Sequence, residues 1–197
     1  RSPRVIGDIN YGYPPLLPYI ISFLDKKYHQ SVQYISPLFD IFTAVLGYMF
    51  LLKHIGSTHI SILAISIYLF SPILIYQSVS LNTRQPANFF ATLSIYFLYL
   101  SLSHDTSLQV SSCIIMSALF CSVIPLLNRV TLQSTYAIII GVSIFYSLES
   151  LVIIPISIFI SIIITNGYMI KSYVEHYRII KAHFIVKTDN YSFFSLL

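Results

Sequence analysis

One short stretch near the start of the sequence holds most of the side chains that could do chemistry. Residues 7–15 read GDINYGYPP and combine an acid, an amide, two tyrosines and several turn-forming residues. The two prolines cannot lie inside a helix because proline lacks a donor N–H and restricts the residue before it. Asp8 is therefore predicted to lie on an irregular loop beside Tyr11 and Tyr13. Such a loop presents a carboxylate among aromatic rings.

The rest of the sequence has the composition of an integral membrane protein. Hydrophobic residues make up 56% of the 197 residues, charged residues only 9%, and the mean hydropathy is +0.77. From Lys53 to Lys171 the charged residues are spaced 31, 21, 24, 20 and 22 positions apart. A helix needs about 20 apolar residues to cross a bilayer, so charges at this interval mark the ends of membrane spans.

The charge spacing predicts an all-α fold, a polytopic transmembrane helical bundle with about six spans. An apolar stretch at 14–24 is too short to cross and is predicted to form an interfacial helix after the first loop. Ser36 is expected to cap the first span, and Pro72 to kink the second. The predicted spans are residues 36–52, 60–80, 87–102, 108–127, 133–148 and 151–165.

Two regions follow from this pattern. Residues 1–170 form the transmembrane region, and residues 171–197 form a truncated basic segment at the interface or in a loop. The sequence begins with Arg1 rather than Met, so we expect a fragment whose first span precedes Arg1. An Asn-Tyr-Ser sequon at 190–192 is compatible with an external C-terminal segment.

Several classes of function receive no support. The net charge of +4 is spread over loops, so nucleic acid is not an expected partner. The six histidines show no zinc-binding spacing, so no metal ligands of that kind are predicted. Cys113 and Cys121 lie about two helical turns apart on one span, too far for a mutual disulfide. Phosphate-binding glycine loops and nucleophile elbows are not found in the sequence.

The order of motifs in residues 3–103 resembles the GT-C superfamily of polytopic membrane glycosyltransferases. The resemblance consists of an acidic first loop, a Tyr-Pro-Pro-Leu stretch at 13–16, and Ser-Pro pairs at 36–37 and 71–72. A polar turn at 78–85 follows them. It implies a transferase that moves a sugar from a polyprenyl-phosphate carrier to an acceptor hydroxyl, with the bilayer and the lipid-linked donor as partners.

The resemblance also implies roles for individual residues. Asp8 would be the catalytic base or a metal-associated acid, although the family's acid can equally precede Arg1. Arg84, two residues before a helix predicted to start at Pro86, would hold the lipid phosphate, with Arg4 as a second choice. Tyr11 and Tyr13 would pack against the sugar or the prenyl chain. The cofactor stays open, with a divalent metal ion as one option.

Other interpretations of the same residues stay open. Asp8 can be a solvated turn former, and Arg84 an interfacial arginine that reaches the headgroups. Asp40, one turn inside a span, is either functional or stabilised by the helix dipole. Arg129 and Glu149 are expected to mark corners. The whole chain could instead be a transporter or channel subunit, or a membrane scaffold without catalysis.

Two arguments place the first loop on different sides of the membrane. The six spans place ten of the eleven basic residues on one side and leave Lys53 alone on the other. The positive-inside rule then makes the first loop cytoplasmic. The resemblance implies that the same loop is extracytoplasmic, and the membrane concerned is not identified.

Overall fold

The computed structural model shows a chain of helices. It describes residues 16, 34–72, 83–103, 106–171, 173–174 and 177–178, and every regular element within these ranges is helical. The first loop, the rest of the predicted interfacial helix at 14–24 and the residues beyond 178 lie outside the described part. The elements are α2 (Ile35–Ile55), α3 (Thr58–Leu69), α5 (Arg84–Ser103), α6 (Ser107–Leu127), α7 (Arg129–Phe145), η3 (Leu148–Val152) and α8 (Ile153–Ile164).

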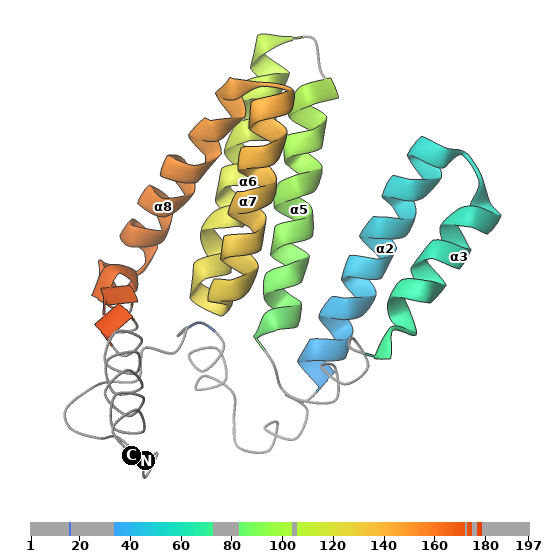
Figure 1. The fold of residues 1–197 in the computed structure, drawn as a ribbon, viewed down its shortest axis with the longest axis horizontal. Helices are drawn as coiled ribbons and strands as arrows, with labels where there is room; N and C mark the ends of the chain where they lie inside the picture. Colours follow the sequence, from blue (N-terminus) through green and yellow to red (C-terminus); the bar gives the residue numbers. More distant parts are fainter. Residues whose placement is uncertain are drawn as a thin grey trace, which may run out of the picture.

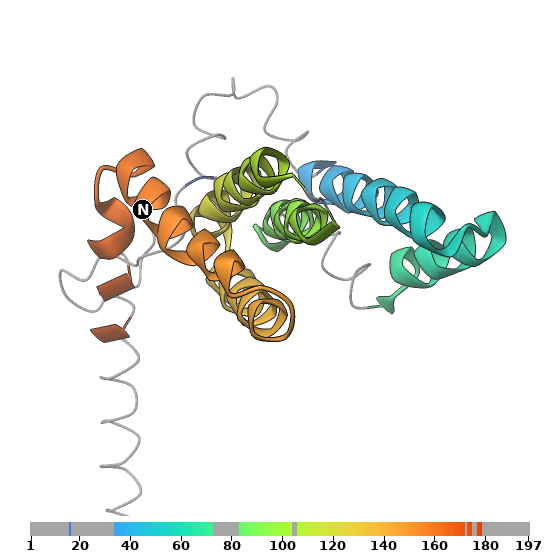
Figure 2. The same cartoon turned by 90° about the horizontal axis from the view of Figure 1, so that it is seen from above.

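The helices run up and down between two ends of the molecule (Figure 1). Seen along their axes, α3 and α2 lie on one side of α5, while α6, α7 and α8 lie on its other side (Figure 2). Helices α2 and α5 run parallel. The ring centres of Phe39 and Phe89 lie 5.4 Å apart near the start of the two helices, and those of Phe50 and Tyr99 lie 5.3 Å apart nearer their ends. We call the end where α2, α5 and α7 begin the polar end, and the opposite one the Lys53 end.

The six α-helices of the described chain overlap the six predicted spans, which confirms the all-α fold, whereas the crossing of a membrane by each of them stays a prediction. Arg84 and Arg129 begin helices at the polar end, whereas Lys53 lies in the last turn of α2 at the other end. Glu149 lies in η3 at the corner between α7 and α8, as predicted. Helices α2 and α6 are long and apolar enough to cross a membrane, whereas α3, α7 and the η3–α8 segment are apolar but shorter.

Helix α3 covers only the first part of the second predicted span. Helix α3 ends at Leu69, and the N–H of Phe70 bonds to the carbonyl oxygens of Ser66 and Tyr68. The break lies just before Pro72, because proline disfavours helical backbone at the residue that precedes it. The remainder of the predicted span, residues 73–80, lies outside the described residues.

The predicted Ser36 cap is wrong. Helix α2 begins one residue earlier, at Ile35, with Tyr34 at the N-cap position and no side-chain cap hydrogen bond. Ser36 lies in the first turn and is buried. Pro37 still lies in the first turn, where proline's missing N–H removes no helical hydrogen bond.

Two other helix ends use residues that commonly end helices. Asn128 is the single residue between α6 and α7, and its side-chain oxygen accepts hydrogen bonds from the N–H groups of Val130 (2.9 Å) and Thr131 (3.1 Å). After α8, Asn166 and Gly167 have φ values of 48° and 78°, which favour asparagine and glycine. The Asn-Gly pair thus ends the helical segment as such pairs commonly do.

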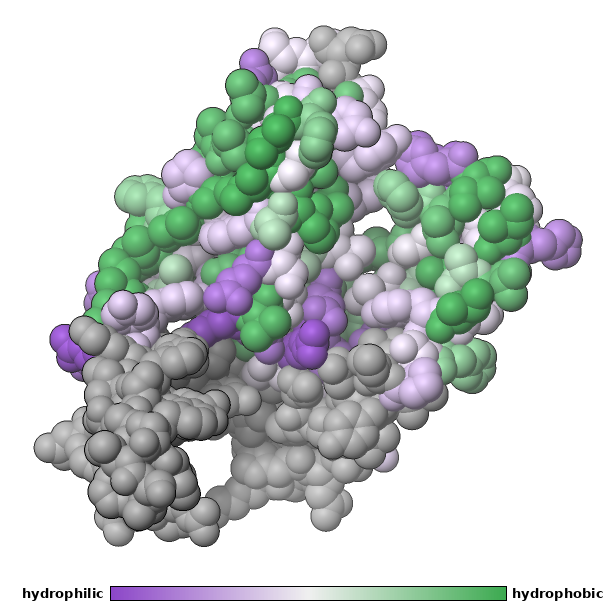
Figure 3. All heavy atoms as spheres, viewed as in Figure 1, coloured by the Kyte–Doolittle hydropathy of each residue, from purple (hydrophilic) through white to green (hydrophobic). Residues whose placement is uncertain are grey.

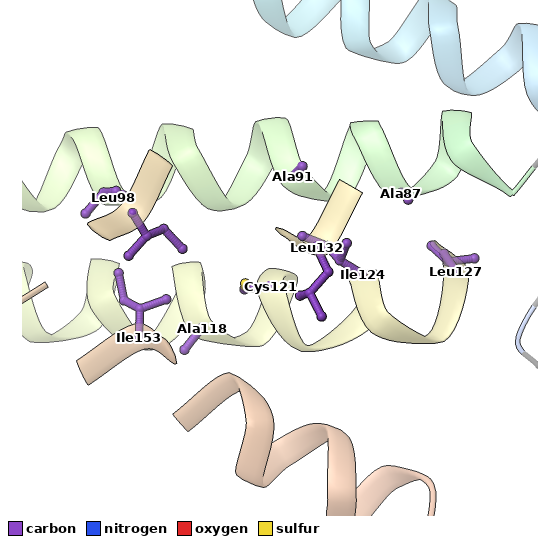
Figure 4. Close-up of a cluster of buried hydrophobic side chains, with 10 residues drawn as sticks. Ala87, Ala91, Leu98, Ala118, Cys121, Ile124, Leu127, Leu132 and Ile153 are labelled. Atoms are coloured by element: carbon purple, nitrogen blue, oxygen red, sulfur yellow. The ribbon is translucent and has the colours of Figure 1, made fainter. Parts of the chain in front are cut away.

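The tightest packing lies between α5 and α6. The Ser94 hydroxyl donates to the carbonyl oxygen of Ser117 at 3.0 Å, and the Ser117 hydroxyl donates to that of Ser94 at 2.8 Å. Small side chains let the two backbones approach this closely. Around the pair lies a cluster of buried residues drawn from four helices: Ala87, Ala91, Leu98, Ala118, Cys121, Ile124, Leu127, Leu132, Ile139 and Ile153 (Figure 4).

Among the buried residues of the described chain the polar ones are mostly serines, and many large apolar side chains are exposed. The buried serines are Ser36, Ser61, Ser94, Ser101, Ser117, Ser122, Ser143, Ser150, Ser157 and Ser161. In contrast, Leu63, Ile67 and Phe159 are each more than 60% exposed. Hydrophobic residues cover much of the visible surface of the helices (Figure 3). An apolar surface of this extent is uncommon on monomeric water-soluble proteins.

The Ser94–Ser117 contact predicts that substitution of a buried serine and of an exposed serine in α5 and α6 will change the stability of the protein by different amounts. Ser94→Val should lower the free energy of unfolding by about 1–3 kcal/mol, because the added methyl groups force α5 and α6 apart and the hydrogen bonds are lost. Ser112→Val, on the exposed face of α6, should change it by less than about 0.5 kcal/mol. Denaturant unfolding in detergent measures both, and equal effects would contradict the packing argument.

Candidate functional site

The candidate site lies at the polar end, where the first turn of α5 carries Arg84 and Gln85. Helix α5 begins at Arg84, and the N–H of Ala87 bonds to the carbonyl oxygen of Thr83 at 3.2 Å. Arg84 therefore belongs to the first turn, rather than preceding a helix that starts at Pro86. Its side chain is exposed, so a permanent positive charge lies beside the positive end of the α5 dipole.

Gln85 differs from its neighbour Arg84 in its exposure to solvent. Its side chain is fully buried, and neither the amide nitrogen nor the amide oxygen has a hydrogen-bond partner in the described part of the chain. A buried amide without hydrogen bonds costs about 1–3 kcal/mol. A polar group kept in this position at such a cost is a candidate for binding a ligand.

A hydrogen bond joins α5 to α7 one turn deeper. The hydroxyl of Thr131 donates to the side-chain oxygen of Asn88 at 3.1 Å. Thr131 is also held by the Asn128 cap at the α6–α7 corner. This contact fixes the distance between the starts of α5 and α7, and hence between the residues that begin them, Arg84 and Arg129.

Arg129 connects the segment after α8 to this end of the bundle. Its guanidinium carbon lies 4.9 Å from the centre of the Tyr173 ring, within the range of a cation–π contact. Burial raises the pKa of Tyr173, although the Arg129 charge acts to lower it. The phenol therefore stays neutral at physiological pH, and the pair is a cation on a ring rather than an ion pair.

Asp40 is the acidic residue nearest this end among those described. It lies in the second turn of α2, is 4% exposed, and its charge acts on Tyr68 of α3. Its position agrees with the predicted location one turn inside a span. A buried carboxylate close to a helix start is stabilised by the dipole there, so both the functional and the structural interpretation stay open.

The predicted site residues divide into two groups. Asp8, Arg4, Tyr11 and Tyr13 lie outside the described residues, so their roles stay predictions. Arg84 is described, and lies exposed at the polar end.

Three residues that the fold places near Arg84 were not predicted from the sequence: Gln85, Asn88 and Thr131. One available signal was the pair of amides, Gln85 and Asn88, at the start of an otherwise apolar helix.

Metal chemistry receives no direct support at this end. Within the described ranges, no group of three or more histidine, cysteine, aspartate or glutamate side chains could hold a metal ion. Asp8, the predicted base or metal-associated acid, lies outside these ranges. At this end the described residues offer an exposed arginine, Arg84, and a partly exposed amide, Asn88, which suit an anionic or hydroxyl-rich ligand.

The buried amide predicts a mutation that stabilises the protein. Gln85→Leu should raise the free energy of unfolding by about 1–2 kcal/mol, because it removes an amide that has no hydrogen bonds in the described structure. Gln109→Leu, on the exposed first turn of α6, serves as the matched control and should change it by less than about 0.5 kcal/mol. Denaturant unfolding in detergent measures both. A destabilised Gln85→Leu variant would mean that the amide is hydrogen-bonded in the folded protein.

Comparisons of the chain with protein-family models, with curated proteins and with solved structures give no match.

Proposed function

We propose that this chain belongs to an integral membrane glycosyltransferase that transfers a sugar from a polyprenyl-phosphate carrier to an acceptor hydroxyl. The observation that carries the proposal is the polar end, where an exposed arginine, a buried amide and a second arginine start neighbouring helices. The order of motifs in residues 3–103 supplies the reaction class.

The distribution of side chains supports the membrane part of the proposal. Large apolar residues are exposed along α2, α3, α7 and α8, while serines and alanines make up much of the buried interior, together with some leucines and isoleucines. In lipid, apolar side chains gain nothing from burial, so helices associate through small residues and interhelical hydrogen bonds. Both features are expected of a bundle whose solvent is a bilayer, and α2 and α6 have the length for it.

Arg84 is the residue we propose for the donor phosphate. Its guanidinium presents several donors in a fixed geometry that matches a phosphate group, and it stays charged at any physiological pH. The first turn of α5 adds the positive end of the helix dipole. Gln85, directly beside it, would provide amide donors and acceptors for hydroxyl groups if the first turn shifts to expose it.

Asp8 is the residue we propose for the base. The segment that contains it joins the described chain at Tyr34, next to the polar end, and the intervening apolar stretch at 14–24 is too short to cross a bilayer. Asp8 would then lie on the same side as Arg84. The carboxylate takes the proton of the acceptor hydroxyl, the acceptor oxygen bonds to the anomeric carbon, and the lipid phosphate leaves with the electrons of the broken bond.

Transfer of a labelled sugar from a polyprenyl-phosphate donor tests the proposal. In membranes carrying the full-length protein at matched expression, Asp8→Asn should lower transfer by at least about 100-fold, because the base is lost. Arg84→Gln should lower it by about 10-fold or more, because a charged hydrogen bond to phosphate is lost. Arg178→Gln, an exposed arginine beyond α8, should leave transfer within about twofold.

The other outcomes separate the competing interpretations. Full activity of Asp8→Asn with loss in Asp40→Asn would transfer the role of base to the buried acid of α2. Full activity of Arg84→Gln would make that residue an ordinary interfacial arginine. An absence of transfer from every polyprenyl-phosphate donor would favour the transporter, channel subunit or scaffold.

A further inference from the structure

A large cavity lies between α2 and α5, near the Lys53 end and therefore away from the candidate site. Its volume is about 950 Å³, which is within the usual range for sites that bind small molecules. Helices α2 and α5 supply most of its wall, and Val142 of α7 and Tyr146, the residue after α7, close one side. Figure 3 shows the surface hollowed between the α2–α3 pair and the other helices.

The lining of this cavity changes from apolar to polar along its length. Leu46 and Ile95 represent the apolar wall, and Lys53 and Ser103 lie at the ends of their helices. Among the described residues that line the cavity, Lys53 is the one with a formal charge. The cavity therefore has a long apolar wall and, among the described residues, one positively charged side chain, Lys53, at one end.

Contacts between aromatic residues stabilise the part of the cavity wall next to Lys53. The Tyr99 hydroxyl and the His54 Nδ1 are 3.3 Å apart, and the Phe50 ring lies 5.3 Å from the Tyr99 ring and 4.5 Å from the His54 ring. These contacts join the last turns of α2 and α5 beside Lys53. Tyrosine and lysine at the end of an apolar helix are the residues that anchor at the level of lipid headgroups.

We infer that this cavity binds an anionic phospholipid, with an acyl chain against the apolar wall and the phosphate at Lys53. An apolar ligand without charge would leave the ammonium group unused, and a small soluble anion would leave the long apolar wall bare. An amphiphile with one negative head matches both parts. The inference rests on the membrane part of the proposed function but not on sugar transfer.

Lipid retention tests the headgroup assignment. The purified full-length protein in neutral detergent is incubated with equal amounts of palmitoyl-oleoyl phosphatidylglycerol and phosphatidylcholine, and bound lipid is counted by native mass spectrometry. Wild type should retain the anionic lipid about fivefold over the zwitterionic one, the scale of one lysine near an anionic surface. Lys53→Gln should retain the two equally, whereas Lys171→Gln, an exposed lysine after α8, should keep the preference.

A second variant tests the cavity itself. Thr92→Phe places a ring against the cavity wall and should lower retention of both lipids at least about threefold, because it occupies the volume of the acyl chain. Thr92 is half-buried, and the variant is compared with wild type only if its thermal unfolding is unchanged. Unchanged retention by this variant would mean that lipid binds elsewhere, and would overturn the inference.

The remaining outcomes separate this inference from the proposed function. Equal retention of the two lipids by wild type would overturn the headgroup assignment and leave membrane insertion standing. A protein that stays monodisperse without detergent and retains neither lipid would overturn both. A crosslink from position 53 to a second copy of the chain, with no lipid retained, would make the cavity a protein contact.

Discussion

The close approach of α5 and α6 is the contact on which the rest of the described structure depends. Ser94 and Ser117 exchange hydrogen bonds between hydroxyl and backbone, which requires small residues on both helices. The other helices attach to this pair. On one face Ser161 of α8 donates to the carbonyl oxygen of Ser122 at 2.7 Å, and on another the aromatic rings of α2 pack against those of α5.

Much of the fold could be predicted from where charges interrupt the apolar sequence. A charged residue in an apolar span is costly, so Arg84, Arg129 and Glu149 had to lie near helix ends, and they do. The end of α3 at Leu69 and the start of α2 before Ser36 could not be predicted in the same way. A helix end depends on local backbone choices, and several neighbouring residues often satisfy the same pattern.

The candidate site was less predictable than the fold. Arg84 could be found because a lone charge followed by a proline marks a helix start. The contact of Asn88 with Thr131 joins residues 43 positions apart, and no periodic pattern connects them. Burial of Gln85 depends on how neighbouring helices tilt, which the sequence of α5 alone does not specify. The two ends of the bundle thus differ in chemistry, with amides and arginines at one and a lone lysine beside an apolar cavity at the other.

The corner at Asn128 has a consequence for how this sequence can vary. Helices α6 and α7 share one intervening residue, and its side chain already occupies two N–H groups of the second helix. An inserted residue would rotate α7 by about 100°, since a helix turns once every 3.6 residues. That rotation would carry Thr131 away from Asn88. Length variation among homologous sequences should therefore accumulate at other loops and avoid this corner, which makes residue 128 a fixed reference point for aligning divergent relatives.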